Sequence, residues 1–231
     1  MKAILLDIEG TTTPIDFVHK TLFPYARLRM PAYVSSHFGE LDQEIDLLRI
    51  EHEKDLGYTE DFDPHVAKSV AKYLVYLIDA DRKSTPLKSI QGKIWKKGYE
   101  SGELKSIVFD DVLPAFERWY SSGIVIAIYS SGSALAQKLL FRNTNQGDLT
   151  RFIAEYFDTT TGAKQDSESY ARISEDLGLE AGEIIFCSDV VNELDAARLA
   201  GFQTVLVLRK GNAEITEDVT YRTIESFDEL E

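Results

Sequence analysis

The sequence predicts an α/β protein that has a parallel β-sheet core and a block of helices inserted after the first strand. Short apolar runs alternate with amphipathic segments through the second half of the chain, which is the pattern of a sheet covered by helices. The first apolar run ends at Leu6, and the next convincing one begins only at Ile124. The interval between these two runs has helical rather than strand periodicity.

Five runs are expected to be strands because they are short and apolar, as strands buried on both faces are. They are Ala3–Leu6, Ile124–Tyr129, Tyr156–Asp158, Glu183–Cys187 and Thr204–Leu208. Helices are expected between the later strands, at Ala134–Phe141, Ser167–Leu177 and Asn192–Ala200. This alternation favours a parallel sheet with helices on both faces.

The interval from about Asp16 to Leu104 is expected to be helical. Its apolar residues fall three and four positions apart, and Lys68, Lys72 and Asp79 lie off the stripe that they form. The clearest stripe consists of Val66, Val70, Leu74, Leu77 and Ile78. The alternative is that this interval contains weak strands.

Composition and charge exclude several classes of protein. The 231 residues include 39 acidic and 25 basic side chains, a net charge of −14 that disfavours binding to nucleic acids or anionic membranes. The single cysteine, Cys187, excludes a disulfide framework and a multi-cysteine zinc site, and we expect it to be a buried strand residue. The apolar run near the start of the sequence is too short for a signal peptide, and no apolar run is long enough to span a membrane. The expected compartment is the cytoplasm.

Two carboxylates follow the first predicted strand, in the segment Asp7-Ile8-Glu9-Gly10-Thr11-Thr12. In open α/β sheets ligands bind at the carboxyl ends of the strands, so both acids are candidates for a site there. Asp7 would serve as a nucleophile or metal ligand, and Glu9 as a general acid and base. The alternative is that both residues cap a helix or lie in a solvated loop.

Hydroxyl groups follow the second strand, in Ser130-Ser131-Gly132-Ser133. Hydroxyls and the free N–H groups of a helix N-terminus suit a phosphate. Serine is also a preferred N-cap residue, so a purely structural role is the alternative.

Two further candidates follow later strands. Lys164 could pair with a phosphate and a carboxylate at once, although most lysines are simply surface residues. Asp189 follows a strand, with Glu193 four residues later, and could complete an all-oxygen site of the kind that Mg²⁺ prefers. The alternative for Asp189 is capping of the next helix.

The segment from Asp81 to Lys105 is locally basic. Its seven basic residues against three acidic ones give a local charge of +4, which could guide an anionic substrate. A solvated helix face is the alternative. The basic residues are Arg82, Lys83, Lys88, Lys93, Lys96, Lys97 and Lys105.

The order of these clusters resembles the haloacid dehalogenase superfamily of aspartyl phosphotransferases. That order is a strand followed by Asp-x-acid-Gly-Thr, a strand followed by Ser, a loop Lys, and a strand followed by Asp with an acid four residues on. The resemblance implies a Rossmann-like core with a helical cap inserted after the first strand. The core would comprise residues 1–14 and 105–231, and the cap residues 15–104.

Several stretches narrow the resemblance to the enolase-phosphatase family of methionine salvage. The second acid is Glu9 where most of the superfamily has Asp. The other similar stretches are Phe17-Val18-His19, Leu22-Phe23-Pro24-Tyr25, Gln91-Gly92 with Ile94-Trp95 and Gly98-Tyr99, Gly102-Glu103-Leu104, Ser130-Ser131-Gly132-Ser133 and Asp166-Ser167-Glu168-Ser169-Tyr170.

The resemblance implies a bifunctional, Mg²⁺-dependent reaction. The substrate 2,3-diketo-5-methylthiopentyl-1-phosphate would be enolised and then dephosphorylated, through an aspartyl phosphate, to the acireductone 1,2-dihydroxy-3-keto-5-methylthiopentene. It implies one Mg²⁺ per chain and a monomer, while the acidic composition predicts no nucleic-acid or membrane partner.

The resemblance also implies a role for each candidate residue. Asp7 would be the nucleophile and a metal ligand, and Glu9 the acid and base, with its backbone carbonyl on the metal. Asp189 would complete the metal ligands. The remaining residues are Ser130 and Ser131, which would hold substrate oxygens, Lys164, which would neutralise the phosphate and carboxylate charge, and Glu193, which would orient the metal's surroundings.

Two other functions are compatible with parts of this pattern. One is a related phosphatase acting on a sugar or glycolate phosphate, which Glu9 and the Gln91–Tyr99 stretch argue against. The other is a catalytically dead module that binds phosphorylated ligands. A binding module would not need the nucleophile that the set Asp7, Glu9, Lys164 and Asp189 supplies.

Overall fold

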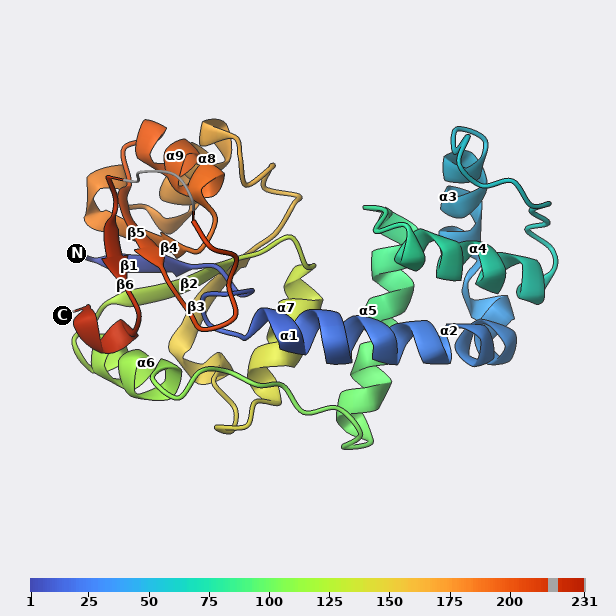
Figure 1. Ribbon diagram of the computed structural model, residues 1–231, viewed down its shortest axis with the longest axis horizontal. Coiled ribbons are helices and arrows are strands. Elements are labelled where there is room, and N and C mark those ends of the chain that lie inside the picture. The colour runs from blue at the N-terminus through green and yellow to red at the C-terminus, as the bar shows by residue number, and fades with distance from the viewer. Residues whose placement is uncertain (216–219, 231) are drawn as a thin grey trace. The chain divides into compact units, whose positions relative to one another are not determined.

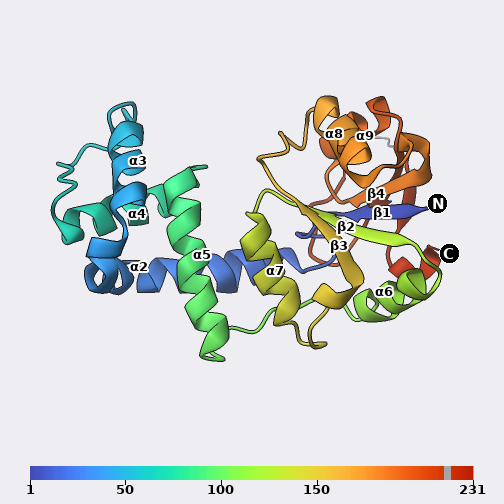
Figure 2. The same cartoon turned by 180° about the vertical axis from the view of Figure 1, so that it is seen from behind.

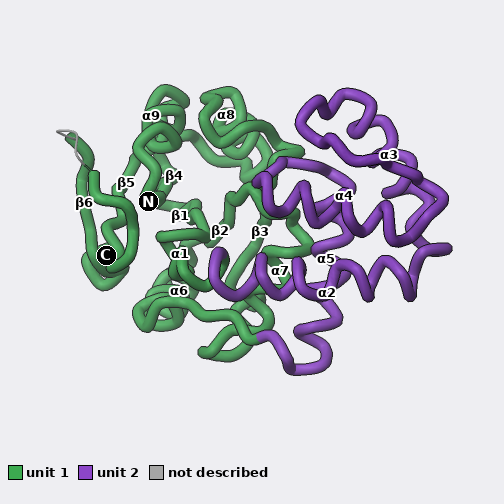
Figure 3. Tube along the Cα trace, turned by 45° about the vertical axis from the view of Figure 1, so that its right-hand side comes forward, with its two compact units in different colours: residues 1–18, 105–231 green, residues 19–104 purple. Residues whose placement is uncertain are grey.

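The chain forms two compact units, coloured separately in Figure 3. The computed structural model describes residues 1–215 and 220–230. The first unit comprises Met1–Val18 and Lys105–Glu231, and the second comprises His19–Leu104.

The first unit contains a parallel sheet in which the described residues form six strands in the order β3-β2-β1-β4-β5-β6 (Figure 1). The α/β fold with a parallel sheet is therefore confirmed. The predicted strands are all present; β1 has the predicted ends, and the ends of the others differ by at most three residues, with the largest shift at the start of β3. The strands are β1 (Ala3–Leu6), β2 (Val125–Tyr129), β3 (Ile153–Phe157), β4 (Ile184–Ser188), β5 (Gln203–Val207) and β6 (Arg222–Ile224).

Helices cover both faces of this sheet, as Figures 1 and 2 show from opposite sides. On one face α8 (Ser167–Leu177) and α9 (Val191–Leu199) pack on alternate residues of the strands, such as Ala3 and Leu5 of β1. The other face carries α6 (Val112–Ser121) and α7 (Ala134–Arg142), whose Phe116 and Phe141 rings lie 6.2 Å apart. Apolar burial on both faces explains why the central strands β1, β2 and β4 consist almost entirely of apolar residues.

The strand order places the carboxyl ends of β2, β1 and β4 side by side. The chain adds β2 and β3 on one side of β1 and β4 to β6 on the other, so the order reverses at β1. In open α/β sheets the crevice at this reversal is where ligands bind. Each of the predicted site residues lies in a loop or first helical turn that follows one of the strands β1 to β4, with Lys164 in the loop after β3.

Two elements of the first unit were not predicted. The strand β6 (Arg222–Ile224) is a three-residue edge strand with two exposed residues, so it has no apolar run that could identify it. The helix α6 begins at Val112 and has Pro114 in its first turn, where proline is tolerated although it usually indicates a break. Residues Ala115, Phe116 and Trp119 of α6 are buried.

The second unit is helical, and its described residues contain no strand, as predicted. Its helices are α2 (Phe23–His37), α3 (Asp42–His52), α4 (Ala67–Asp79) and α5 (Thr85–Glu100). The short helix α1 (Ile15–Phe17) and a π-helical turn (Val18–Leu22) precede them. The second unit has a 3₁₀ turn at Phe38–Glu40. The first unit has 3₁₀ turns at Thr150–Phe152, Ala181–Glu183 and Phe227–Glu229.

The predicted apolar stripe forms the inner face of α4. Val70, Leu74 and Leu77 are buried, as their spacing requires. Val66 was wrongly included in the stripe, because it lies outside the helix as its N-cap residue and is exposed. In the part of the chain that the structure describes, no helix has the length and apolar character needed to cross a bilayer.

Candidate active site

Asp7 is a buried carboxylate at the carboxyl end of β1. Its Oδ1 accepts a hydrogen bond from the backbone N–H of Ile8 at 2.7 Å and pairs with Lys164 Nζ, also at 2.7 Å. It caps no helix, because α1 begins after Pro14 and has no side-chain cap. Asp7 and Lys164, both candidates for one site in the sequence, are therefore in contact.

Lys164 bridges two acids. Its ammonium group also lies 2.6 Å from Glu193 Oε2, and the side chains of Lys164 and Glu193 are only 9% and 11% exposed. Burial by itself would lower the pKa of Lys164, but the Asp7 and Glu193 carboxylates outweigh burial and raise it. Lys164 is thus a buried, protonated cation rather than the surface lysine of the alternative interpretation.

Ser188 connects the same two acids and is a residue that the sequence analysis did not assign. It is the last residue of β4, fully buried, and its hydroxyl lies 3.0 Å from Glu193 Oε2 and 3.4 Å from Asp7 Oδ2. The single hydroxyl hydrogen is best placed on the shorter contact, so Ser188 donates to Glu193. Burial and the Asp7 carboxylate raise the pKa of Glu193. The signal available in the sequence was the position of Ser188 directly before Asp189.

Asp189 lies against the backbone of the loop that follows Asp7. A Cβ atom on Gly10 would be 2.2 Å from Asp189 Oδ2, so the carboxylate touches this glycine next to the carbonyl of Glu9. Burial and the Asp7 carboxylate raise the pKa of Asp189 to about 7. Asp189 does not cap α9, whose N-cap residue is Val190. The Glu9 side chain is half-buried.

Asn212 holds the same loop and was also missed. Its Nδ2 donates to the carbonyl oxygen of Gly10 at 2.9 Å, from the turn that follows β5. A Gly211-Asn212 pair after an apolar strand is a typical turn signal, but nothing local indicates that this turn reaches residue 10.

Of the three serines in the loop after β2, only Ser133 caps the next helix. Ser133 caps α7, because its side chain accepts a hydrogen bond from Ala136 N at 3.3 Å. Ser130 is buried and its hydroxyl accepts from Gly132 N at 3.2 Å, whereas Ser131 is exposed. The capping alternative thus applies to Ser133 and not to Ser130. Asp158, after β3, accepts from Ala134 N at 2.9 Å and fixes the start of α7.

Cys187 and two basic residues of the Asp81–Lys105 segment have contacts or burial that account for them without a catalytic role. Cys187 is fully buried, and burial raises the pKa of its thiol, which makes it a poor nucleophile. Part of the basic segment is engaged within the second unit, since Arg82 pairs with Asp55 and Lys93 pairs with Glu44.

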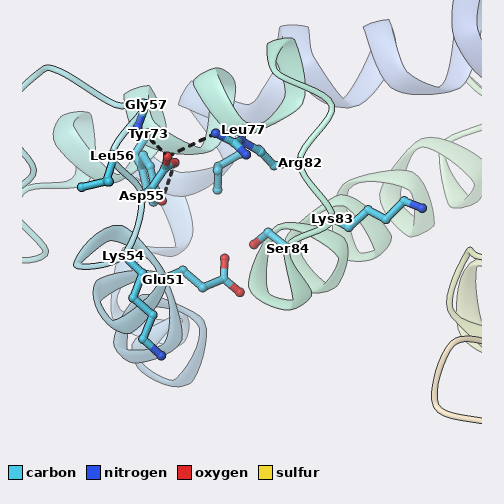
Figure 4. A pocket seen from close by; sticks show the side chains of 10 residues that line it. All are labelled: Glu51, Lys54, Asp55, Leu56, Gly57, Tyr73, Leu77, Arg82, Lys83 and Ser84. Carbon is cyan, nitrogen blue, oxygen red and sulfur yellow. Dashed lines mark hydrogen bonds and ion pairs between the residues drawn. The ribbon is translucent and has the colours of Figure 1, made fainter. Parts of the chain in front are cut away.

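The second unit contains a separate pocket of about 560 Å³ (Figure 4). Asp55 is one of its lining residues and accepts hydrogen bonds from Gly57 N, the Tyr73 hydroxyl and Arg82. The lining is Glu51, Lys54, Asp55, Leu56, Gly57, Tyr73, Leu77, Arg82, Lys83 and Ser84, which includes no residue that the sequence analysis assigned to the site.

The oxygen atoms at the sheet edge suit a hard cation. Among residues 1–215 and 220–230, no group of three or more His, Cys, Asp or Glu side chains has the arrangement of a metal site. The candidate ligands at the sheet edge include only two side chains, the carboxylates of Asp7 and Asp189. The third candidate is the backbone carbonyl of Glu9, next to Gly10. Such all-oxygen donors, completed by water or substrate, are typical of Mg²⁺ sites.

Comparison with known proteins decides the family. Residues 1–201 match the family described as haloacid dehalogenase-like hydrolase. An enolase-phosphatase E1 of Synechococcus elongatus is 50% identical over 98% of this chain and 96% of its own length. One from Sorangium cellulosum is 47% identical over 99% and 97%. The chain belongs to the enolase-phosphatase E1 family of haloacid dehalogenase-like hydrolases.

Further relatives support the family or the fold. The solved UTR4 protein of Saccharomyces cerevisiae is 34% identical, with a TM-score of 0.83 and 99% of both chains covered. A dehalogenase structure at 19% identity and a TM-score of 0.58 shares the fold. An Arabidopsis thaliana protein named probable bifunctional methylthioribulose-1-phosphate dehydratase/enolase-phosphatase E1 is 46% identical, and the match covers 98% of this chain and 47% of that protein. The predicted family is thus confirmed, and the chain is a phosphatase of this family.

Proposed function

We propose that the protein converts 2,3-diketo-5-methylthiopentyl-1-phosphate to the acireductone 1,2-dihydroxy-3-keto-5-methylthiopentene and phosphate, in methionine salvage. The observation that carries this proposal is the buried Asp7 carboxylate held by Lys164 at 2.7 Å, with Glu9 two residues later. The names of relatives about 50% identical over nearly the whole chain support the substrate.

In the proposed dephosphorylation, Asp7 is the nucleophile. One of its carboxylate oxygens attacks phosphorus, and the bond between phosphorus and the substrate oxygen breaks as Glu9 gives that oxygen a proton. Water then attacks the aspartyl phosphate while Glu9 takes its proton, which releases phosphate and restores the Asp7 carboxylate. The Lys164 ammonium offsets the repulsion between the carboxylate and phosphate anions.

Two serines are proposed to hold the phosphate. Ser130 and Ser131 follow β2 at the same sheet edge as Asp7, and α7 begins three residues beyond them with Ala134. Hydroxyl groups and the N–H groups at the start of a helix bind phosphate oxygens well. Glu193 is proposed to hold Lys164 in place, at 2.6 Å.

A single Mg²⁺ per chain fits the residues of this site. Asp7, Asp189 and the backbone carbonyl of Glu9 would hold it, and Asp189 contacts Gly10, the residue bonded to that carbonyl. When bound, the ion supplies positive charge that stabilises the phosphoryl group and the enediolate formed from the diketone.

Residues 15–104 are proposed to act as the cap that selects the substrate, and residues 1–14 and 105–231 as the catalytic core. The protein is proposed to work as a monomer in the cytoplasm. The net charge of −14 and a lone buried cysteine, which needs no oxidising compartment, support this location. The substrate is a small molecule, and no nucleic-acid or membrane partner is proposed.

The deciding experiment supplies the diketone phosphate with Mg²⁺ and follows phosphate release and the enol absorbance together. We expect both signals from the wild type, and no phosphate from Asp7→Asn, whose amide cannot attack phosphorus. If Asp7→Asn keeps a tenth of the wild-type rate, another residue is the nucleophile. If the wild type hydrolyses p-nitrophenyl phosphate but not the diketone phosphate, the substrate assignment is wrong and only a phosphatase remains.

A further inference from the structure

The loop that carries Lys164 is held by a row of side-chain hydrogen bonds. The backbone carbonyl oxygens of four consecutive residues, Thr161 to Lys164, each accept one hydrogen bond from a side chain. The four pairs are Arg172 Nη1 with Thr161 O (2.7 Å), Tyr129 OH with Gly162 O (3.0 Å), Ser169 Oγ with Ala163 O (2.8 Å) and Tyr170 OH with Lys164 O (2.7 Å).

Three of these donors lie in the buried interior of the first unit. Tyr129 is the last residue of β2, Ser169 and Tyr170 lie in α8, and all three are fully buried. The rings of Tyr129 and Tyr170 pack edge to face, with centroids 5.6 Å apart. Burial raises the pKa of both tyrosines, so their hydroxyls keep the protons that they donate.

Gly162 shows how closely the loop is fitted to α8. A Cβ atom there would lie 2.1 Å from Ser169 Oγ, and its φ of +149° is one that other residues rarely adopt. Glycine therefore allows the loop backbone to approach the helix and bring its carbonyls within reach of the hydroxyls.

The Lys164 ammonium has little freedom left. The backbone carbonyl of Lys164 accepts a hydrogen bond from Tyr170. The Nζ atom of Lys164 lies 5.9 Å from the centroid of the Tyr129 ring, at the limit of a cation–π contact. Fixing a lysine side chain costs rotamer entropy, and movement of its backbone would add to that cost and weaken the contact of Lys164 with Asp7.

We infer that Tyr129 and Tyr170 are positioning residues that hold Lys164 against Asp7 by fixing the backbone of residues 162–164. This inference rests on the role proposed above for Lys164 in phosphoryl transfer. Both tyrosines act through the lysine. Loss of either hydroxyl leaves a carbonyl of the loop without its partner and lets the ammonium move relative to the nucleophile.

The test compares Tyr129→Phe and Tyr170→Phe with Tyr156→Phe. Tyr156 lies in β3 of the same sheet, and its buried hydroxyl has no hydrogen-bond partner among the described residues, so its loss breaks no such bond. Two measurements are made on each full-length variant. One is kcat and KM for p-nitrophenyl phosphate with Mg²⁺. The other is the rate at which acetic anhydride labels Lys164 relative to the exposed Lys210, followed by mass spectrometry.

We expect kcat to fall by about tenfold to a hundredfold in Tyr129→Phe and Tyr170→Phe, because displacements near 1 Å carry costs of that size. KM should change much less. Labelling of Lys164 should rise several-fold in both variants, since an amine that leaves its ion pairs becomes reactive. Tyr156→Phe should match the wild type in both measurements.

Wild-type labelling of Lys164 in both tyrosine variants would overturn the inference, even if kcat falls. If Tyr170→Phe does not fold, Tyr129→Phe alone decides. Failure of the proposed function has a different signature, namely a wild type that releases no phosphate from either ester. The labelling ratios would still decide whether the hydroxyls hold Lys164.

Discussion

Gly10 and Asp189 are in direct contact across the crevice between β1 and β4. The φ of Gly10 is +68°, and a Cβ atom at this position would lie 2.2 Å from Asp189 Oδ2. Asn212 holds the same residue by donating a hydrogen bond to the Gly10 carbonyl at 2.9 Å. The loop after Asp7 thus has room for an acid at position 189 only because residue 10 lacks a side chain.

Gly10→Ala is expected to reduce both stability and activity. The left-handed backbone alone costs a residue with a Cβ about 1–2 kcal/mol. The new methyl group must also displace Asp189, so the Mg²⁺ concentration needed for half-maximal phosphate release should rise. Urea unfolding and a Mg²⁺ titration of activity measure the two effects.

Gly123→Ala is the matched control for this change. Gly123 has a φ of +74°, and a Cβ atom there meets nothing within 4 Å. It should lose a similar amount of stability from its backbone, about 1–2 kcal/mol, and keep the wild-type Mg²⁺ dependence. If both variants show the same Mg²⁺ dependence, the contact with Asp189 does not shape the metal site.

Removal of divalent metal is expected to stop both half-reactions. The donors available at the sheet edge, Asp7, Asp189 and the Glu9 carbonyl, are all oxygen, so Mg²⁺ should restore activity after treatment with EDTA. Phosphate release and enol absorbance are measured before and after Mg²⁺ is returned. Undiminished turnover in metal-free buffer would refute the metal site.

Glu9→Gln is expected to separate the two half-reactions. General acid–base groups typically contribute about a hundredfold to ten-thousandfold, so dephosphorylation should slow by an amount in that range. Glutamine keeps the backbone carbonyl, so Mg²⁺ binding should persist. Enolisation should continue in part, and the phosphorylated enol should accumulate in stopped-flow absorbance spectra of the variant but not of the wild type.

Two other results would change the role of Glu9. If both steps disappear while Mg²⁺ affinity is unchanged, Glu9 also serves enolisation. If neither step slows, the acid and base of the reaction lie elsewhere.

Glu44→Gln is expected to weaken the second unit in a pH-dependent way. Glu44 Oε1 accepts hydrogen bonds from Ser89 and Lys93, both at 2.6 Å. Burial acts to raise the pKa of Glu44, but these two bonds outweigh it and lower the pKa. A lowered carboxyl pKa stabilises the fold above the unfolded-state value of about 4.3, and this contribution is lost as the pH falls through the folded-state pKa.

The melting temperatures of wild type and Glu44→Gln should therefore differ most near neutral pH and converge in acid. Glu53→Gln is the control, because Glu53 belongs to an exposed pair with Arg49 at 3.9 Å and should change little. A gap between wild type and Glu44→Gln that widens in acid would contradict the prediction.

Much of the architecture could be read from local sequence. Strands such as Ala3–Leu6 are buried on both faces, so every residue of the strand is apolar and the run is visible by itself. The helices α4 and α8 have one buried face, which gives their apolar residues a helical period. The edge strand β6 escaped prediction because it buries only Ile224.

The sequence by itself placed candidate functional groups at three strand ends, because Asp7 and Ser130 directly follow apolar runs and Asp189 follows such a run after Ser188. What it could not determine is which of these groups touch. The contacts of Lys164 with Asp7 and Glu193, of Ser188 with Glu193, and of Asn212 with Gly10 join segments that are distant along the chain. Such contacts depend on strand order and loop conformation, which sheet packing sets and no local periodicity records. Only the tertiary structure therefore shows that the loop of Lys164 accepts hydrogen bonds from the hydroxyls of Tyr129, Ser169 and Tyr170.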